Sequence, residues 1–180
     1  PRSTIRLENQ SGTSKLIDSK TGTEHTKNMQ AFAKKIAHKL KSEEIYGYIF
    51  KARPPTFGPD SKHLTDAETE KISRKSAGMH VHELRNFNPY IPVEEEGRLK
   101  DPGIKENWIT RVYAYYNLKT QVFPDPTMAK IVKFHTNHKY TILSHCEKTH
   151  SILGKLVGNS ARLCPKETAK QYEPLFMKAL

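Results

Sequence analysis

The sequence predicts an α/β fold with a parallel sheet in its first two thirds, followed by an all-helical domain. Two observations carry this prediction. Between residues 15 and 50, two runs of strand length flank an amphipathic helical stripe, an order that is typical of a crossover between parallel strands. From Asp125 onward, the apolar spacing is helical throughout. We therefore expect a first domain over residues 1–124 and a second over residues 125–180.

The chain is strongly basic. It has 180 residues, a formal net charge of +11 at pH 7 and a pI of about 9.6. Such a surface attracts anions, among them nucleotides, nucleic acid and anionic lipid, although the cationic residues are scattered rather than gathered in one run. The mean hydropathy is −0.72, and no run of eighteen apolar residues occurs, so we expect no transmembrane helix.

The cysteines bear on the cellular compartment that we expect, and the chain ends bear on whether the sequence is a fragment. Cys146 and Cys164 are the only two cysteines and lack a CxxC spacing, so the sequence predicts neither a disulfide framework nor a cysteine-rich metal site. A reducing, cytoplasmic location is expected. The start at Pro1 lacks both Met and an apolar signal core, and the helical pattern continues to Leu180. We therefore expect a fragment of a longer protein.

Strand and helix signals alternate in the first part of the chain. Ile5–Leu7 and Lys15–Asp18 are predicted strands with a turn between them, and Thr26 is a predicted cap of the next helix. That helix has an apolar stripe at helical spacing, which consists of Met29, Phe32, Ala33, Ile36, Ala37 and Leu40. Tyr46–Phe50 is a further predicted strand.

A stiff basic loop follows this strand. Lys51 and Arg53 come directly after it, Pro54 and Pro55 stiffen the backbone, and Gly58 permits a sharp turn. In open α/β sheets, ligands bind beyond the carboxyl ends of the strands, so the loop is a candidate site. A rigid connector with solvated charges is the alternative.

A run of carboxylates marks a second candidate site. Tyr90–Val93 reads as a short strand or an extended run, for which the proline favours an edge position, and Glu94, Glu95 and Glu96 follow it directly. Clustered like charges raise a carboxyl pKa, so one of the three could act as a general acid or base. The alternative is a solvated turn in which Arg98 is the partner.

The second part of the chain is predicted to be helical. A short helix over Gly78–Phe87 precedes the edge strand, and after it Asp101-Pro102 and Pro124-Asp125-Pro126 each open a longer helix. Ser151–Val157 forms another helix, and Pro165 opens the last one, in which Pro174 is expected to cause a kink or a restart. Apolar stripes mark the buried faces of the two longer helices; they consist of Ile104, Trp108, Ile109, Val112, Tyr113, Tyr115 and Tyr116 in one, and of Met128, Ile131, Val132, Ile142 and Leu143 in the other.

Three histidines lie on the predicted helix that carries the stripe from Met128 to Leu143. His135 points into its middle, while His138 and His145 lie at its edge. A His-x-x-His pair with a further histidine could bind zinc, but no carboxylate or cysteine completes a familiar pattern. Buried, hydrogen-bonded histidines are therefore the preferred interpretation, and no metal site is predicted.

Several of these runs resemble known families. The first part resembles the thiouracil desulfidase family, and the motif Phe134-His135-x-x-His138-Lys139-Tyr140 resembles the YbgA-type helical domain, which is often fused behind it. The desulfidase resemblance is carried by Gly47–Arg53 with Pro55 and Gly58, by Ile91–Leu99 with Asp101, Pro102, Arg111 and Val112, and by Pro1, Arg2, Ile5–Leu7, Thr21, Gly22 and Thr26. The YbgA resemblance is also carried by Leu143, His145, Leu153, Gly154, Leu156 and Val157.

The resemblance implies a Rossmann-like domain with a [4Fe-4S] cluster on three cysteines, at which sulfur leaves a thiolated pyrimidine such as thiouracil. It also implies that a carboxylate activates water. One cluster cysteine and an active-site serine belong to the basic loop, where this chain has Phe57 and Pro54. The other two cysteines and a glutamate correspond to positions before Pro1. The cluster is therefore not supported by the residues present.

Two functions follow from this comparison. The first is a desulfidase-family protein that is inactive or altered, with Lys51, Arg53, Glu94, Glu95 and Arg98 as substrate-binding residues. The second is a non-catalytic module that binds a nucleotide or nucleic acid. In both, His135, His138, Lys139 and His145 form a polar motif of the helical domain, and a plain scaffold for protein contacts is a third option.

Overall fold

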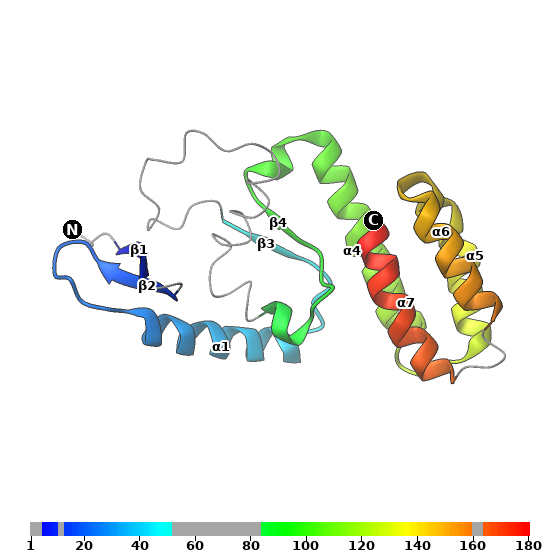
Figure 1. The fold of residues 1–180 in the computed structure, drawn as a ribbon, viewed down its shortest axis with the longest axis horizontal. Coiled ribbons are helices and arrows are strands. Elements are labelled where there is room, and N and C mark those ends of the chain that lie inside the picture. The colour runs from blue at the N-terminus through cyan, green and yellow to red at the C-terminus, as the bar shows by residue number, and fades with distance from the viewer. Residues whose placement is uncertain (1–4, 11–12, 52–83, 160–163) are drawn as a thin grey trace. The chain divides into compact units, whose positions relative to one another are not determined.

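The computed structural model describes residues 5–10, 13–51, 84–159 and 164–180 (Figure 1). They divide into two compact units: one lies within residues 1–45, 49–89 and 95–97, and the other within residues 46–48, 90–94 and 98–180. The elements in chain order are β1 (Ile5–Gln10), β2 (Thr13–Asp18), α1 (Thr26–Ser42), β3 (Tyr48–Phe50), β4 (Val93–Glu95), the 3-10 turn η1 (Arg98–Lys100), α4 (Pro102–Gln121), α5 (Met128–His145), α6 (Glu147–Gly158) and α7 (Pro165–Ala179).

The first two strands form an antiparallel hairpin, in a register that pairs Ile5 with Asp18. Both strands are longer than predicted. At the end of β2, the Asp18 carboxylate accepts hydrogen bonds from the backbone N–H groups of Lys20, at 2.8 Å, and Thr21, at 3.0 Å. Gly22 has a φ of 68°, a conformation that a side chain would strain. The turn after the hairpin is thus fixed by a buried carboxylate and a glycine.

Helix α1 begins at Thr26, but Thr26 does not cap it, so that prediction was wrong. His25 is the N-cap residue and makes no side-chain capping bond. The Thr26 hydroxyl instead accepts a hydrogen bond from the Leu16 backbone N–H at 3.0 Å, and both residues are buried. The hydroxyl therefore joins the start of α1 to β2.

The predicted stripe of α1 is only partly buried. Ala33 and Ala37 are buried, whereas the Phe32 side chain is 53% exposed, contrary to the prediction. Among the strands of the described residues, β1 is the one that pairs with β2, so the predicted crossover between parallel strands on either side of α1 is not formed.

The parallel pair is β3 with β4. The Tyr48 N–H donates to the Pro92 carbonyl, and the Glu96 N–H donates to the Phe50 carbonyl, both at 2.9 Å. Residue numbers rise in the same direction on both strands, which defines a parallel pair. The predicted fold class is therefore confirmed: a small parallel sheet with helices, then an all-helical region.

The helix starts follow from local capping chemistry. Asp101 caps α4 as predicted, because its carboxylate accepts from the N–H groups of Gly103 at 2.8 Å and Ile104 at 3.1 Å. Helix α5 starts later than predicted, with Thr127 as its cap. Pro165 opens α7 as predicted, and that helix continues through Pro174 without a restart.

Aromatic rings fill the core of the helical unit. Phe134 of α5 packs edge-on against Tyr172 and Phe176 of α7, with ring centroids 5.9 and 5.1 Å apart. Helix α6 packs against both of these helices, and α4 contacts α5 and α7 (Figure 1). Val132 and Leu143 of the predicted α5 stripe are 43% and 41% exposed, so the buried face is narrower than predicted.

The stripe of α4 is also narrower than predicted. Tyr115 is buried, but Ile109, Tyr113 and Tyr116 are exposed by 39%, 66% and 45%. Tyr46 nevertheless contacts the Tyr116 ring edge-on, at a centroid distance of 4.9 Å.

One ion pair joins α4 to α7 next to this core. Lys119 Nζ lies 2.6 Å from Glu173 Oε1, and the Glu173 residue is only 7% exposed. The ammonium also lies over the Phe123 ring, 4.1 Å from its centroid. Burial, with Glu173 and then Tyr46 as smaller causes, raises the pKa of Tyr115 above its ordinary range.

Of the predicted helix over Gly78–Phe87, the structure describes only residues 84–87, which are helical, with Leu84 buried. Within the part of the chain that is described, no helix has the length and apolar character needed to cross a membrane.

Gly47 provides a test of packing. A Cβ at this position would lie 2.6 Å from Val112 Cγ2 and 3.2 Å from Trp108 Cζ2, because the backbone before β3 lies directly on α4. Gly47→Ala is expected to lower the free energy of unfolding by about 1–3 kcal/mol, as overpacking does. Urea denaturation measures this change.

Gly154→Ala is the matched control, because a Cβ there has no atom within 4 Å and the site lies within α6. This substitution should leave stability unchanged or raise it by about 0.5–1 kcal/mol. Equal effects of the two substitutions would contradict the close packing at Gly47.

Glu173 provides a second test. Glu173→Gln leaves the Lys119 ammonium without its partner and should reduce the free energy of unfolding by about 2–4 kcal/mol. Glu167→Gln, at an exposed position of the same helix, should change it by less than about 0.5 kcal/mol. A Glu173→Gln protein as stable as the Glu167→Gln protein would show that the pair does not stabilise the helices.

Candidate functional site

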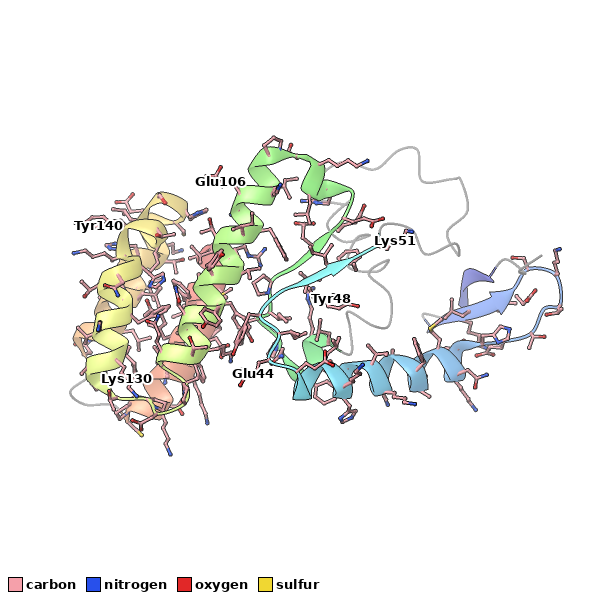
Figure 2. The ribbon with its side chains drawn as sticks, turned by 180° about the vertical axis from the view of Figure 1, so that it is seen from behind. Glu44, Tyr48, Lys51, Glu106, Lys130 and Tyr140 are labelled. Atoms are coloured by element: carbon pink, nitrogen blue, oxygen red, sulfur yellow. The ribbon has the colours of Figure 1, made fainter. Side chains whose placement is uncertain are left out.

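The parallel pair brings charged residues of both predicted sites to one sheet edge. Lys51 directly follows β3 and is exposed (Figure 2). Glu95 ends β4, and Glu96, whose N–H bonds to the Phe50 carbonyl, comes next. The carboxyl ends of parallel strands meet at the same edge, so an ammonium and two carboxylates gather there. This is the candidate site of the first unit.

Glu94 and Arg98 form a pair. Arg98 Nε lies 3.0 Å from Glu94 Oε1, and the Glu94 side chain is 15% exposed against 43% for Arg98. The predicted pairing of Arg98 with one of the three glutamates is therefore confirmed. The pair spans the turn from β4 into η1, so it stabilises the chain there, and its role in binding stays a prediction.

The remaining loop residues lie outside the described part of the chain. Arg53, Pro54 and Phe57 fall between residues 52 and 83. Their predicted roles are therefore not tested by the structure.

The polar motif of α5 does not gather at one point. His135 Nδ1 lies 3.0 Å from the Tyr172 hydroxyl, whereas His138 Nδ1 donates to the carbonyl of Phe134 at 2.9 Å. Lys139 Nζ lies over the ring of Tyr140, which is 73% exposed on the outer side of α5 (Figure 2).

His145, the last residue of α5, is exposed. His135 and His138 are hydrogen-bonded, as predicted, but they are half-buried rather than buried, and His145 lies apart from both.

Two residues near His135 were missed by the sequence reasoning. The His150 ring of α6 stacks near the His135 ring, with centroids 6.1 Å apart, and Tyr172 of α7 supplies the hydroxyl. Neither has a spacing that relates it to His135, because the contacts arise from packing of separate helices. Burial lowers the pKa of His135, and His150 and Lys139 lower it further.

Helix α1 presents a basic face. Its 17 residues include five lysines and no carboxylate. Four of the lysines are exposed: Lys27, Lys34, Lys35 and Lys39. Lys39 pairs with Glu43 at 3.8 Å across an exposed turn, where such a pair contributes little. The face is suited to an anionic partner.

The two cysteines lie in the helical region and not near the sheet edge in sequence. Cys146 separates α5 from α6, and Cys164 is exposed at the start of α7. A hydrogen bond with the Thr149 hydroxyl, at 3.2 Å, lowers the pKa of the Cys146 thiol. In the described ranges, no group of three or more His, Cys, Asp or Glu side chains could hold a metal ion.

Iron–sulfur clusters are bound by cysteine thiolates, commonly three or four of them. This chain has two cysteines, and residues 1–96 contain none. Cys146 is engaged with Thr149 at a helix start, and Cys164 starts a different helix. The residues present therefore do not fit a [4Fe-4S] cluster.

The comparisons with known proteins bear on the first half of the chain. A family model described as 2-thiouracil desulfurase matches residues 1–96, which is more than half of the 180 residues. No curated protein and no solved structure matches the chain. The matched residues include the hairpin, α1 and both strands of the parallel pair. The chain therefore belongs to the 2-thiouracil desulfurase family.

Proposed function

We propose that this chain is an altered member of its family, which binds a thiolated pyrimidine but does not itself remove the sulfur by cluster chemistry. The observation that carries this proposal is the loss of the one cluster cysteine whose position falls within residues 1–96, the part that matches the family. Phe57 and Pro54 stand where the resemblance places a cluster cysteine and a serine. A phenylalanine ring has no atom that ligates iron, and a proline has no hydroxyl.

Binding can survive this loss, because it needs different groups. A thiolated pyrimidine carries ring N–H donors and a carbonyl acceptor. Glu95 at the end of β4 could accept from an N–H, and the exposed ammonium of Lys51 could donate to the carbonyl or offset an anionic form of the base. Arg53, Glu94 and Arg98 complete the proposed binding set, with Glu94 and Arg98 acting as a pair.

For the rest of the chain, we propose a YbgA-type helical domain over residues 125–180. Its support is the motif from Phe134 to Tyr140, which lies on α5 and fixes that helix to its neighbours through Phe134 and His135. The family match ends at residue 96, so the division of the chain at residues 124 and 125 stays a prediction.

The basic face of α1 favours a second candidate function, the binding of nucleic acid. Lys34 and Lys35 are exposed on a helix without carboxylates, and the Phe32 side chain, three residues before Lys35, is 53% exposed. Lysines contact phosphates, and an exposed aromatic ring can stack on a base of a single strand. A thiolated pyrimidine within a nucleic acid would unite the two candidates.

The altered-member proposal predicts a colourless protein. After anaerobic treatment with iron and sulfide, the chain should show no absorbance band near ~400 nm, where iron–sulfur clusters absorb, because it lacks the thiolates. 2-Thiouracil incubated with the treated protein should stay unchanged by ultraviolet spectroscopy. An active family enzyme treated in parallel is the control. A brown protein that produces uracil would refute the proposal.

The nucleic-acid candidate predicts a localised loss of binding. The double substitution Lys34→Gln and Lys35→Gln should weaken binding of a single-stranded oligonucleotide, measured by fluorescence anisotropy. If both lysines contact phosphates, the slope of log K against log salt should fall in magnitude by about 1.4.

Lys166→Gln with Lys170→Gln is the matched control, because it removes the same charge from exposed positions of α7. This control should leave the slope unchanged. Equal losses in both double variants would indicate attraction by net charge alone, and absence of binding at low salt would exclude this function.

A further inference from the structure

Three helices meet at a pair of histidine rings. His135 of α5 and His150 of α6 lie nearly parallel, at an interplanar angle of 24° and a centroid distance of 6.1 Å. On the other side, Tyr172 of α7 contacts His135 edge-on and hydrogen-bonds to Nδ1 at 3.0 Å. The His135 ring thus lies between α6 and α7 and contacts both.

The Tyr172 hydroxyl is a neutral hydrogen-bond partner of His135. Tyr172 is only 1% exposed, and burial raises its pKa, so the phenol keeps its proton. In a neutral His135 ring, Nδ1 accepts from this hydroxyl in the Nε2–H tautomer and donates to its oxygen in the Nδ1–H tautomer. In a protonated ring both nitrogens carry hydrogen, so Nδ1 can only donate to the hydroxyl oxygen.

The surroundings of His135 disfavour its positive charge. Lys139 on the same helix and His150 on α6 are both basic, and Tyr172 on α7 is neutral. Glu173, the neighbour of Tyr172 in sequence, is paired with Lys119. Both charged groups that act on His135 are basic, and the carboxylate nearest to His150 in sequence is Glu147, three residues before it on α6.

We propose that His135 and His150 form an acid-responsive contact, which holds α6 against α5 and α7 at neutral pH and weakens when both rings are protonated. The direction follows from linkage. The His135 pKa is lower in the folded chain than in the unfolded one, so the unfolded chain binds more protons in acid. The stabilisation is present above the unfolded pKa of about 6.5 and is lost as the pH falls through the folded pKa.

The test compares melting temperatures of the full chain at pH values of about 7.5 and about 5.5, on either side of the ordinary histidine pKa. The His150→Gln variant lacks the second charge, so its melting temperature should fall less in acid than that of the unaltered chain. If acid lowers the folding equilibrium constant of the unaltered chain tenfold more than that of His150→Gln, the falls in their melting temperatures should differ by roughly 5 °C. His145→Gln, at an exposed position of α5, should behave like the unaltered chain.

NMR titration of the unaltered chain gives a readout that does not depend on a variant. The His135 ring should titrate below the ordinary histidine pKa, and replacing His150 with Gln should move it upward. Resonances of α6 should broaden or shift over the same pH range. A His135 pKa at or above its ordinary value, or equal acid losses in His150→Gln and the unaltered chain, would overturn the proposal.

Discussion

The helical region depends on the burial of Phe134, Tyr172 and Phe176 in one aromatic cluster. Their rings lie 5.1–5.9 Å apart, in the edge-on and stacked arrangements that aromatic quadrupoles favour. Because α5 and α7 both contribute to the cluster, their faces and relative rotation are fixed by it. The position of the half-buried His135 ring beside Tyr172 then follows, as does its basic environment. The aromatic cluster therefore contributes to the stability of this region and also positions the histidine whose protonation is proposed to weaken it.

The sequence was sufficient where the structure depends on local chemistry. The Asp101 cap, the start at Pro165 and the Glu94–Arg98 pair each involve residues within a few positions of one another, so spacing alone predicts them. The sequence was insufficient where a structural feature depends on a residue that is distant in the chain. The Thr26 hydroxyl accepts a hydrogen bond from the Leu16 N–H and does not cap its own helix. Periodicity indicated a buried face of α5 but not its width, since Val132 and Leu143 are 43% and 41% exposed.

The candidate site shows the same division. That charged residues follow β3 and β4 is evident from the sequence, and the parallel pairing that places them at one edge agrees with the predicted fold class. The choice of β4 rather than β2 as the partner in the parallel pair could not be derived, because strand pairing depends on contacts across more than forty residues. His150 and Tyr172 could not be derived either, since no short-range pattern relates them to His135. The family match covers residues 1–96, which include this edge of the parallel pair.

The central claim is that this chain binds a thiolated pyrimidine without a cluster. Isothermal titration of 2-thiouracil into protein freed of metal with a chelator tests that claim most directly, with Lys51→Gln as the binding-site variant and Lys20→Gln, another exposed lysine of the first unit, as its control. The account predicts saturable binding to the metal-free protein, weaker binding to Lys51→Gln and unchanged binding to Lys20→Gln. Binding that appears only after iron and sulfide are added, or no binding under any condition, would contradict it.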